Sequence, residues 1–386
     1  MIGKKILPEQ MRLKILSIVP FPLLPAQSGG QKKTEGFLNA LGNYADLTVV
    51  STKNTSDNTA GNFQYIKLLA PAFFRYFNIF SIRRLKRIGR ESDFIMLDQP
   101  FMGLLGVLLS KPLKKALVIH SHNIEYQRFK TIGKWWWKIL FYYEKWVFSQ
   151  ADYVIFISEI EKQTAIIKLN VRPEKCLVAT YGTMKKEIPK ISGSFIKEFK
   201  SQTGIPEEHK VLLFFGVLDY APNREGIDYI LEEINPYLSK HADFKYSIVI
   251  CGRGLTEKYQ LLENNQIENM KYMGFVDNID DYIAISDVVL NPILTGGGVK
   301  TKVVEALAMN KTVISTKSGA EGVFQEVCGE KLKVLEDRNW EVFSKATIQG
   351  LNENSDIPSD FYLYYNMDNI AKRITQFFEK TISKLN

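Results

Sequence analysis

Short apolar runs alternate with helix-like segments along this chain of 386 residues, and the whole alternation occurs twice. The first series begins at residues 13–19 and the second at residues 211–215, after a polar stretch between Gly182 and His209. Strands that alternate with helices form parallel sheets through right-handed crossovers. The sequence therefore predicts an α/β protein with two Rossmann-like domains, which face each other across a ligand-binding cleft.

The individual elements follow from the same pattern. The predicted strands lie at 13–19, 47–51, 94–97, 117–120 and 153–157 in the first half, and at 211–215, 247–251, 271–273, 288–290 and 312–315 in the second. Helices are predicted at 34–43, 226–238 and 302–309. From Met367 onward, apolar residues recur at helical spacing, which predicts a helix at the C-terminus.

Composition limits the class of protein. The cysteines, Cys176, Cys251 and Cys328, are few and odd in number and form no CxxC pair, which argues against a disulfide framework or a zinc site. The longest apolar run, residues 101–109, is too short to cross a bilayer, and no signal-peptide pattern follows the first residues. We therefore expect an enzyme of the cytoplasm.

Three consecutive glycines, Gly296 to Gly298, follow the predicted strand 288–290 and precede a helix that carries Lys300, Lys302 and Glu305. Glycines let backbone N–H groups approach an anion closely, and a helix N-terminus favours negative charge. Glycines also serve tight packing, and a first-turn glutamate favours the helix dipole without any ligand. With two lysines and a glutamate in register, the stretch predicts a site for a diphosphate joined to a ribose.

This stretch, together with residues 214–223, 312–316 and 319–322, resembles the retaining glycosyltransferases of family 4, also called glycosyltransferase group 1, which have the GT-B fold. The resemblance implies an acceptor-binding domain at residues 11–182 and a nucleotide-sugar-binding domain at residues 183–366. It also implies that the C-terminal helix, residues 367–386, packs back on the first domain.

The resemblance also implies roles for individual residues. Glu305 would bind the ribose, Lys302 would meet the charge on the leaving diphosphate, and His122 would touch the sugar near the reacting carbon. These three are the predicted catalytic residues, whereas His120 is expected in the core. The predicted donor-binding residues are Gly29, Gly30, Gly216, Asn223, Gly252, Arg253, Phe275, Val276, Gly296, Gly297, Gly298, Val299, Lys300 and Thr301.

The chain departs from the family pattern at three places. Gly297 stands where many relatives carry a glutamate, and Val217 and Glu225 stand where many carry the arginine and lysine that reach the diphosphate. We infer that Lys300, Lys302 and the amides of the glycine loop take over the charge of the leaving group.

No Asp-x-Asp pair, the usual chelator of a divalent ion in another glycosyltransferase fold, occurs in the sequence. We therefore expect a mechanism without a metal ion and without any cofactor besides the donor substrate, in which protein cations and amide dipoles stabilise the departing diphosphate. The sequence identifies no general base.

Basic charge is concentrated in places, and the net charge is +8. Residues 75–90 contain six basic residues and no acid, with Phe and Ile interleaved, and Lys134-Trp135-Trp136-Trp137-Lys138 is a second basic and aromatic segment. Such segments can lie on an anionic membrane, although both can also be helices with one face in the core. No nucleic-acid-binding module is present.

The resulting prediction is a glycosyltransferase that moves a sugar from a nucleotide-diphosphate donor to a glycan or lipid-linked acceptor in bacterial surface polysaccharide assembly. It would act in the cytoplasm or at the inner face of the membrane. The alternatives are an epimerase or phosphorylase on the same fold, a catalytically silent nucleotide-sugar or glycan-binding protein, and an NAD enzyme suggested by Gly252-Arg253-Gly254. The last lacks the acidic ribose-binding residue that its fingerprint requires.

Overall fold

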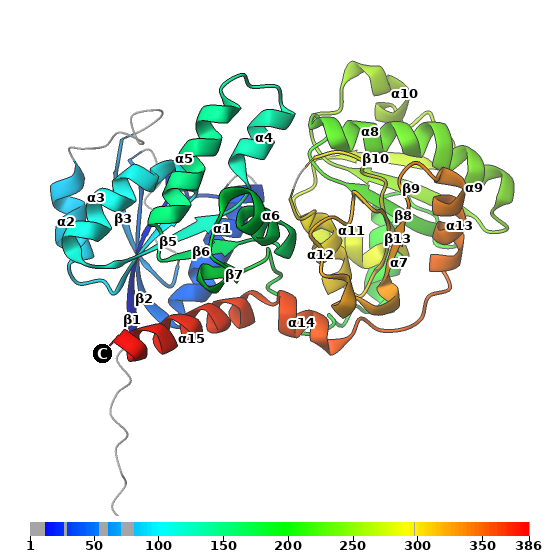
Figure 1. Ribbon diagram of the computed structural model, residues 1–386. Coiled ribbons are helices and arrows are strands. Elements are labelled where there is room, and N and C mark those ends of the chain that lie inside the picture. The colour runs from blue at the N-terminus through cyan, green and yellow to red at the C-terminus, as the bar shows by residue number, and fades with distance from the viewer. Residues whose placement is uncertain (1–11, 27–28, 54–60, 71–80, 297, 386) are drawn as a thin grey trace, which may run out of the picture. The chain divides into compact units, whose positions relative to one another are not determined.

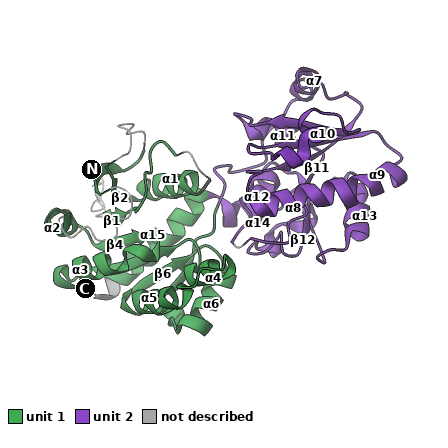
Figure 2. Cartoon of the chain, turned by 90° about the horizontal axis from the view of Figure 1, so that it is seen from above, with its two compact units in different colours: residues 1–181, 367–386 green, residues 182–366 purple. Residues whose placement is uncertain are grey.

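The computed structural model describes residues 12–26, 29–53, 61–70, 81–296 and 298–385. The chain divides into two compact units, residues 1–181 with 367–386 and residues 182–366 (Figure 2). Both units are α/β, and the strands within each sheet run parallel. None of the described helices is long and apolar enough to traverse a bilayer.

Unit 1 contains a seven-stranded sheet in the order β3-β2-β1-β4-β5-β6-β7. Its strands are β1 (Leu13–Ile18), β2 (Ala45–Thr52), β3 (Gln64–Leu69), β4 (Phe94–Asp98), β5 (Ala116–Ser121), β6 (Tyr153–Phe156) and β7 (Cys176–Val178). Its main helices are α1 (Gly29–Gly42), α2 (Ile82–Gly89), α3 (Gly103–Leu113), α4 (Glu125–Thr131), α5 (Trp137–Gln150), α6 (Glu159–Leu169) and α15 (Met367–Leu385), as Figure 1 shows.

The sheet of unit 1 is covered on both faces, so its strands read as nearly continuous apolar runs. Alternate residues of β1 and β4 enter two separate cores. One core lies under α3, α5 and α6, and the other lies under α1 and α15. The C-terminal helix contributes Ile370, Ile374 and Phe378 to the second core, and the Phe378 ring stacks 4.5 Å from that of Phe94 on β4. The last helix is therefore part of unit 1.

Unit 2 contains a six-stranded sheet in the order β10-β9-β8-β11-β12-β13. Its strands are β8 (Lys210–Phe215), β9 (Tyr246–Cys251), β10 (Met270–Gly274), β11 (Val288–Asn291), β12 (Thr312–Thr316) and β13 (Leu332–Leu335). Its main helices are α7 (Gly193–Gln202), α8 (Ala221–Tyr229), α9 (Asn235–His241), α10 (Gln260–Glu263), α11 (Ile279–Ile285), α12 (Thr301–Ala308), α13 (Trp340–Gly350) and α14 (Ser359–Tyr365).

The predicted helix at 226–238 is one continuous segment in three parts, because a π-helical stretch, Ile230–Ile234, joins α8 to α9. Its buried side chains Ile227, Ile230 and Ile234 pack on Phe214 and Leu290 of the sheet. Burial of this apolar face holds the segment against β8 and β11. It thereby fixes the N-terminus of α8 beside the carboxyl end of β8.

Candidate functional site

Glycines line the carboxyl edge of the unit 2 sheet. Gly216 follows β8, Gly252 follows β9, Gly274 ends β10, and Gly296 lies in the loop after β11. These four strands are neighbours in the order β10-β9-β8-β11. Open α/β sheets bind ligands at this end of their strands. The arrangement therefore places partly exposed backbone, with no Cβ atoms of its own, where the sequence predicted the donor site.

At two of these glycines, an added side chain would collide with neighbouring atoms. A Cβ atom added to Gly252, whose φ is +152°, would lie 1.9 Å from the carbonyl oxygen of Gly216. A Cβ atom on Gly296, whose φ is +85°, would lie 2.8 Å from the hydroxyl of Tyr220. Both positions therefore require glycine for the backbone to keep its path.

We expect Gly252→Ala to lower the free energy of unfolding by about 3 kcal/mol, because the new methyl group clashes with backbone rather than with a flexible side chain. Gly193→Ala at the start of α7 is the control, since no atom lies within 4 Å of its added Cβ. Urea unfolding of both variants measures the difference. A Gly252→Ala variant as stable as Gly193→Ala would contradict this account.

Lys302 and Asn223, 79 residues apart, meet beside the end of β8. The ammonium group of Lys302 donates to Asn223 Oδ1 at 2.8 Å and lies 4.4 Å from the ring centroid of Phe214. The amide of Asn223 in turn donates to the carbonyl of Val217 at 2.8 Å. The structure thus brings two predicted donor-site residues into direct contact.

The lowered pKa of Lys302 is compatible with a binding site for an anion. Burial, together with the charge of Lys300, lowers the pKa of Lys302 to about 7 against the opposing effect of Glu305. A lysine with this pKa is only partly charged at neutral pH and gains charge when an anion arrives. Glu305 lies on α12, one helical turn after Lys302, and is half-buried.

Lys300 is turned back onto its own loop. Its ammonium group donates to the carbonyl oxygens of Gly296 and Gly298, the latter at 3.1 Å, and burial lowers its pKa. Lys300 therefore braces the glycine loop from within. Val299 is buried and Thr301 begins α12 half-buried, whereas Gly297 lies outside the described residues.

The remaining predicted donor residues surround this edge at its periphery. Arg253 is exposed, and its carbonyl accepts from the N–H of Leu218 at 2.8 Å, which ties the loop after β9 to the loop after β8. Phe275 is 69% exposed directly after β10, beside the half-buried Val276. Such an exposed aromatic ring at the strand ends can cover a ligand that lies on the glycines.

One contact at this edge was not anticipated from the sequence. Glu225 on α8 accepts a hydrogen bond from the hydroxyl of Thr295 at 2.9 Å. Glu225 therefore anchors the glycine loop to α8, where relatives were expected to place a phosphate-binding lysine. The sequence alone could not predict a contact between two residues 70 positions apart. Only the position of the threonine, directly before the glycines, indicated that its hydroxyl lies in this loop.

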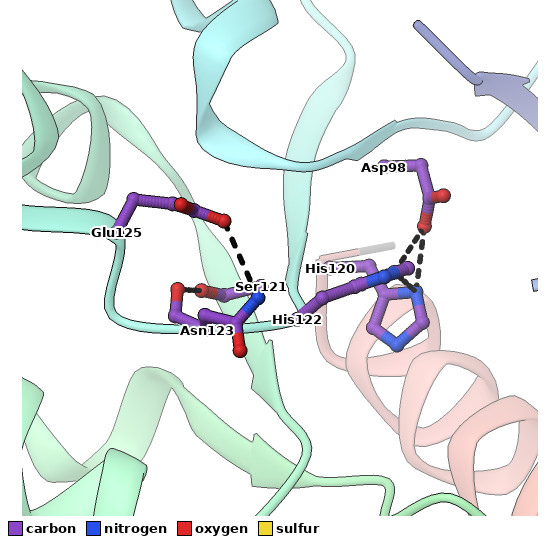
Figure 3. Close-up of polar contacts among 6 residues, drawn as sticks. All are labelled: Asp98, His120, Ser121, His122, Asn123 and Glu125. Atoms are coloured by element: carbon purple, nitrogen blue, oxygen red, sulfur yellow. Dashed lines mark hydrogen bonds and ion pairs between the residues drawn. The ribbon is translucent and has the colours of Figure 1, made fainter. Parts of the chain in front are cut away.

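In unit 1, a buried cluster lies at the carboxyl ends of β4 and β5 (Figure 3). Asp98 Oδ1 lies 2.9 Å from His120 Nδ1 and 2.8 Å from His122 Nε2, and the two nitrogens are 3.3 Å apart. All three side chains are at most 5% exposed. His120 lies in the core, as predicted, and it also belongs to the network that holds His122.

Asp98 is the charged centre of this cluster. Burial alone would raise the pKa of Asp98, but the positive potential of His122 and hydrogen bonds from both imidazoles outweigh it and hold the pKa far below its usual range. Burial lowers the pKa of His120. Only neutral His122, with its single proton on Nε2, donates to Asp98 and leaves Nδ1 as an acceptor for a hydrogen bond from a sugar hydroxyl.

The same cluster has the composition of a metal site. Its three candidate ligand atoms, from Asp98, His120 and His122, lie within 4.8 Å of one another. Asp98 Oδ2 is buried and has no hydrogen-bond partner among the described residues. Two imidazoles and a carboxylate suit zinc or iron. Two imidazole N–H groups that donate to one carboxylate also explain the geometry without any ion.

A second buried carboxylate positions the loop after His122. The side chain of Glu144 on α5 accepts from the backbone N–H groups of Glu125 and Tyr126 at 3.0 and 3.1 Å, and so caps the N-terminus of α4. Burial raises the pKa of Glu144 to about 8 and also raises that of Glu125. Glu144 therefore has a structural role, and it fixes where the chain from His122 to Glu125 turns.

The predicted glycines of unit 1 lie at the start of α1. Gly29 is the first residue of α1, and Gly30 is exposed with no atom within 4 Å of an added Cβ. One turn further, the Lys33 ammonium lies 4.5 Å from the Tyr181 ring, whose centroid is 6.1 Å from that of His122. The start of α1 and His122 are thus joined through Lys33 and Tyr181.

Comparisons with known proteins identify two domains in the chain. A domain model described as Glycosyltransferase Family 4 matches residues 30–182, and one described as Glycosyl transferases group 1 matches residues 209–353. A comparison with curated proteins finds no match.

Solved structures share the fold over nearly the whole chain. Sucrose-phosphate synthase from Thermosynechococcus elongatus is 14% identical with a TM-score of 0.70, and the match covers 96% of this chain and 100% of that one. Anabaena HepE in complex with UDP is 18% identical with a TM-score of 0.68, at the same coverage. WaaG, a glycosyltransferase involved in lipopolysaccharide biosynthesis, is 11% identical with a TM-score of 0.62, and the match covers 94% of this chain and 99% of that one.

These three likenesses are too low in identity to show more than the GT-B fold, but the two domain models match most of the chain in the order that this fold requires. Residues 30–182 therefore form a Glycosyltransferase Family 4 domain, and residues 209–353 form a glycosyl transferases group 1 domain.

Proposed function

We propose that this chain transfers a sugar from a nucleotide-diphosphate donor to a glycan or lipid-linked acceptor, with retention of configuration and without a metal ion. The observation that carries the proposal is the contact of Lys302 with Asn223. This contact lies beside the glycine edge, the name used here for Gly216, Gly252, Gly274 and Gly296 at the carboxyl ends of the unit 2 strands. The site combines open backbone with a buried cation of lowered pKa. A departing diphosphate requires this combination, since its charge grows as the glycosidic bond breaks.

The roles of the other residues follow from their positions. The backbone amides after Gly296 and the N-terminus of α12 bind the diphosphate. The carboxylate of Glu305 accepts hydrogen bonds from the ribose hydroxyls, and the ring of Phe275 covers the base. In unit 1, His122 accepts a sugar hydroxyl at Nδ1 while Asp98 holds its ring. Because HepE binds UDP and WaaG takes part in lipopolysaccharide biosynthesis, we favour a uridine donor and a role in surface polysaccharide assembly at the inner face of the membrane.

The function is tested with the full-length protein and a panel of nucleotide sugars. We expect one donor to raise the melting temperature and to be hydrolysed slowly without acceptor, with an unchanged rate in EDTA. Binding without hydrolysis or transfer to any acceptor would identify a nucleotide-sugar-binding protein instead. Interconversion of the donor sugar would identify an epimerase. Strict dependence on added Mg²⁺ or Mn²⁺ would overturn the metal-free mechanism.

Glu305→Gln should weaken donor binding by about tenfold or more, because a hydrogen bond to a charged group contributes about 1.5–3 kcal/mol. Calorimetry with the nucleotide diphosphate measures the change. Glu268→Gln, an exposed residue just before β10 and so at the opposite end of the strands, is the control and should bind as the wild type does. Unchanged affinity of Glu305→Gln would refute the ribose assignment.

A further inference from the structure

One side of α5 and the connection that precedes it carry large apolar side chains that face solvent. Ile132, Trp135, Ile139, Tyr142 and Trp146, here called the α5 outer face, are 57%, 83%, 65%, 71% and 37% exposed. Residues 139, 142 and 146 of α5 are spaced by three and four, so they share one side of the helix, whereas Ile132 and Trp135 lie in the connection between α4 and α5. A continuous apolar surface of this kind on a protein in water marks a binding surface.

The opposite side of α5 is already occupied. Leu140, Val147 and Phe148 are buried in the core of unit 1, and Trp136 packs at 4.5 Å on the ring of Phe129. The three adjacent tryptophans are thus divided, with Trp136 and Trp137 packed inward against the core and Trp135 outward. A surface helix normally turns polar side chains to solvent opposite its buried side, whereas α5 carries apolar side chains on both sides. The α5 outer face therefore has the character of a surface that another molecule covers.

The exposed charges of α3, α4 and α5 and of the connections between them have one sign. From residue 99 to residue 151 the only acids are Glu125 and Glu144, which are 1% and 0% exposed. The same segment contains eight basic residues, Lys111, Lys114, Lys115, Arg128, Lys130, Lys134, Lys138 and Lys145. Every acid of α3, α4 and α5 is therefore withdrawn from the surface, while Lys134, Lys138 and Lys145 flank the α5 outer face.

The neighbouring helix α3 extends the same surface. Leu104 and Leu108, one turn apart on α3, are 45% and 42% exposed. The N–H of Leu104 donates to the hydroxyl of Tyr143 on α5 at 3.3 Å, which joins the two helices. In Figure 1, α4 and α5 form a helical pair at the periphery of unit 1, with α3 beside them.

We propose that the α5 outer face docks on an anionic lipid bilayer. Tryptophan and tyrosine favour the interfacial region of a membrane, isoleucine enters its apolar edge, and lysines reach its anionic headgroups. A second copy of the chain fits less well, because a two-fold interface would place the same lysines against one another. The surface lies outside the residues assigned to sugar transfer, so the proposal does not depend on that activity.

The structure separates this surface from the other segment that the sequence suggested. Residues 75–80 lie outside the described residues, and α2 covers the rest of that segment. Leu85 of α2 is buried, and Ile82 and Ile88 pack on the core, so α2 presents cations but no apolar side chain to a membrane. An arginine row alone attracts a bilayer through charge that salt screens, whereas the α5 outer face also inserts apolar groups.

The test is sedimentation of the full-length protein with vesicles of phosphatidylglycerol and phosphatidylcholine in equal amounts. We expect Trp135→Ser with Ile139→Ser and Tyr142→Ser to lower partitioning by at least about tenfold, in low and high salt alike. The control is Ile160→Ser with Ile167→Ser on α6, whose side chains are 49% and 66% exposed but stand among Glu159 and Glu161. This control should bind as the wild type does.

Three outcomes would overturn the proposal. The wild type could remain in the supernatant with these vesicles at low salt. The triple variant could bind as the wild type does, which would assign membrane contact to another surface such as α2. Light scattering could show a dimer that the triple variant dissociates, which would make a second copy the occupant. Unchanged thermal unfolding of the triple variant confirms that the fold is intact in each comparison.

Discussion

Lys302→Met is expected to lower kcat by about 10²–10³-fold, while donor affinity falls much less. The lysine ammonium contacts Asn223 beside the glycine edge, where the diphosphate is proposed to gain negative charge as it departs. An interaction that strengthens in the transition state affects kcat more than ground-state binding. Steady-state kinetics with the donor found by panel screening, together with calorimetry on the nucleotide diphosphate, separate the two quantities.

The matched control for this variant is Lys311→Met. Lys311 is a second buried lysine of unit 2, just beyond the C-terminal end of α12, and its ammonium donates to the carbonyl of Ala284 at 2.7 Å. Burial lowers its pKa to about 8. Its loss removes a buried amine without touching the glycine edge, so kcat should stay near the wild-type value. Equal losses in both variants would show that the effect of Lys302 is structural.

The dependence of kcat/KM on pH distinguishes a catalytic role of Lys302 from a structural one. Lys302 has a pKa of about 7 and is useful to a departing anion only when protonated. The value of kcat/KM for the donor should therefore decline as pH rises above about 7, since this ratio reports the free enzyme. Lys302→Arg stays charged at all accessible pH values and should lose this alkaline decline. A flat wild-type profile up to pH 9 would contradict the assignment.

The sheet could be predicted from the sequence where its strands are central. Buried parallel strands such as 94–97 and 288–290 are uninterrupted apolar runs, and both appear as strands. The strands that were not predicted, β3, β7 and β13, all lie at sheet edges. The exposure pattern of β3 mixes exposed and half-buried residues, so the apolar signal fades where one side of a strand has no neighbour.

The site was predictable only where function leaves a local pattern. The glycine loop with Lys300, Lys302 and Glu305 is one contiguous segment, and the proximity of Lys302 to Asn223 came from the resemblance of two segments to one family. The partnership of Thr295 with Glu225 and the network of Asp98 with His120 and His122 join residues that tertiary packing brings together. Asp98 was overlooked because an aspartate at the end of an apolar strand resembles an ordinary turn residue.

Asp98→Ala should lower the free energy of unfolding by about 3–5 kcal/mol, because it removes the charged acceptor that two buried imidazoles share. Asp98→Asn keeps an acceptor oxygen but loses the charge, so it should cost about 1–3 kcal/mol. Asp93→Ala, at the other end of β4, is the control. Asp93 accepts from the N–H of Lys14 at 2.8 Å at an exposed position, so its loss should cost less than either change at Asp98.

The same measurement distinguishes the two explanations of the cluster. If hydrogen bonds alone hold Asp98, His120 and His122 together, EDTA leaves the unfolding midpoint of the wild type unchanged, and Asp98→Asn retains part of the stability. If the three groups hold an ion, chelation lowers the wild-type midpoint, and Asp98→Asn and Asp98→Ala become nearly equal, because a neutral amide is a poor ligand for zinc or iron. Metal analysis of the purified protein then identifies the ion. A metal ion on Nε2 would leave the proton of His122 on Nδ1, which could then donate to a sugar hydroxyl but not accept from one. Donor hydrolysis before and after chelation therefore shows which state of the cluster serves catalysis.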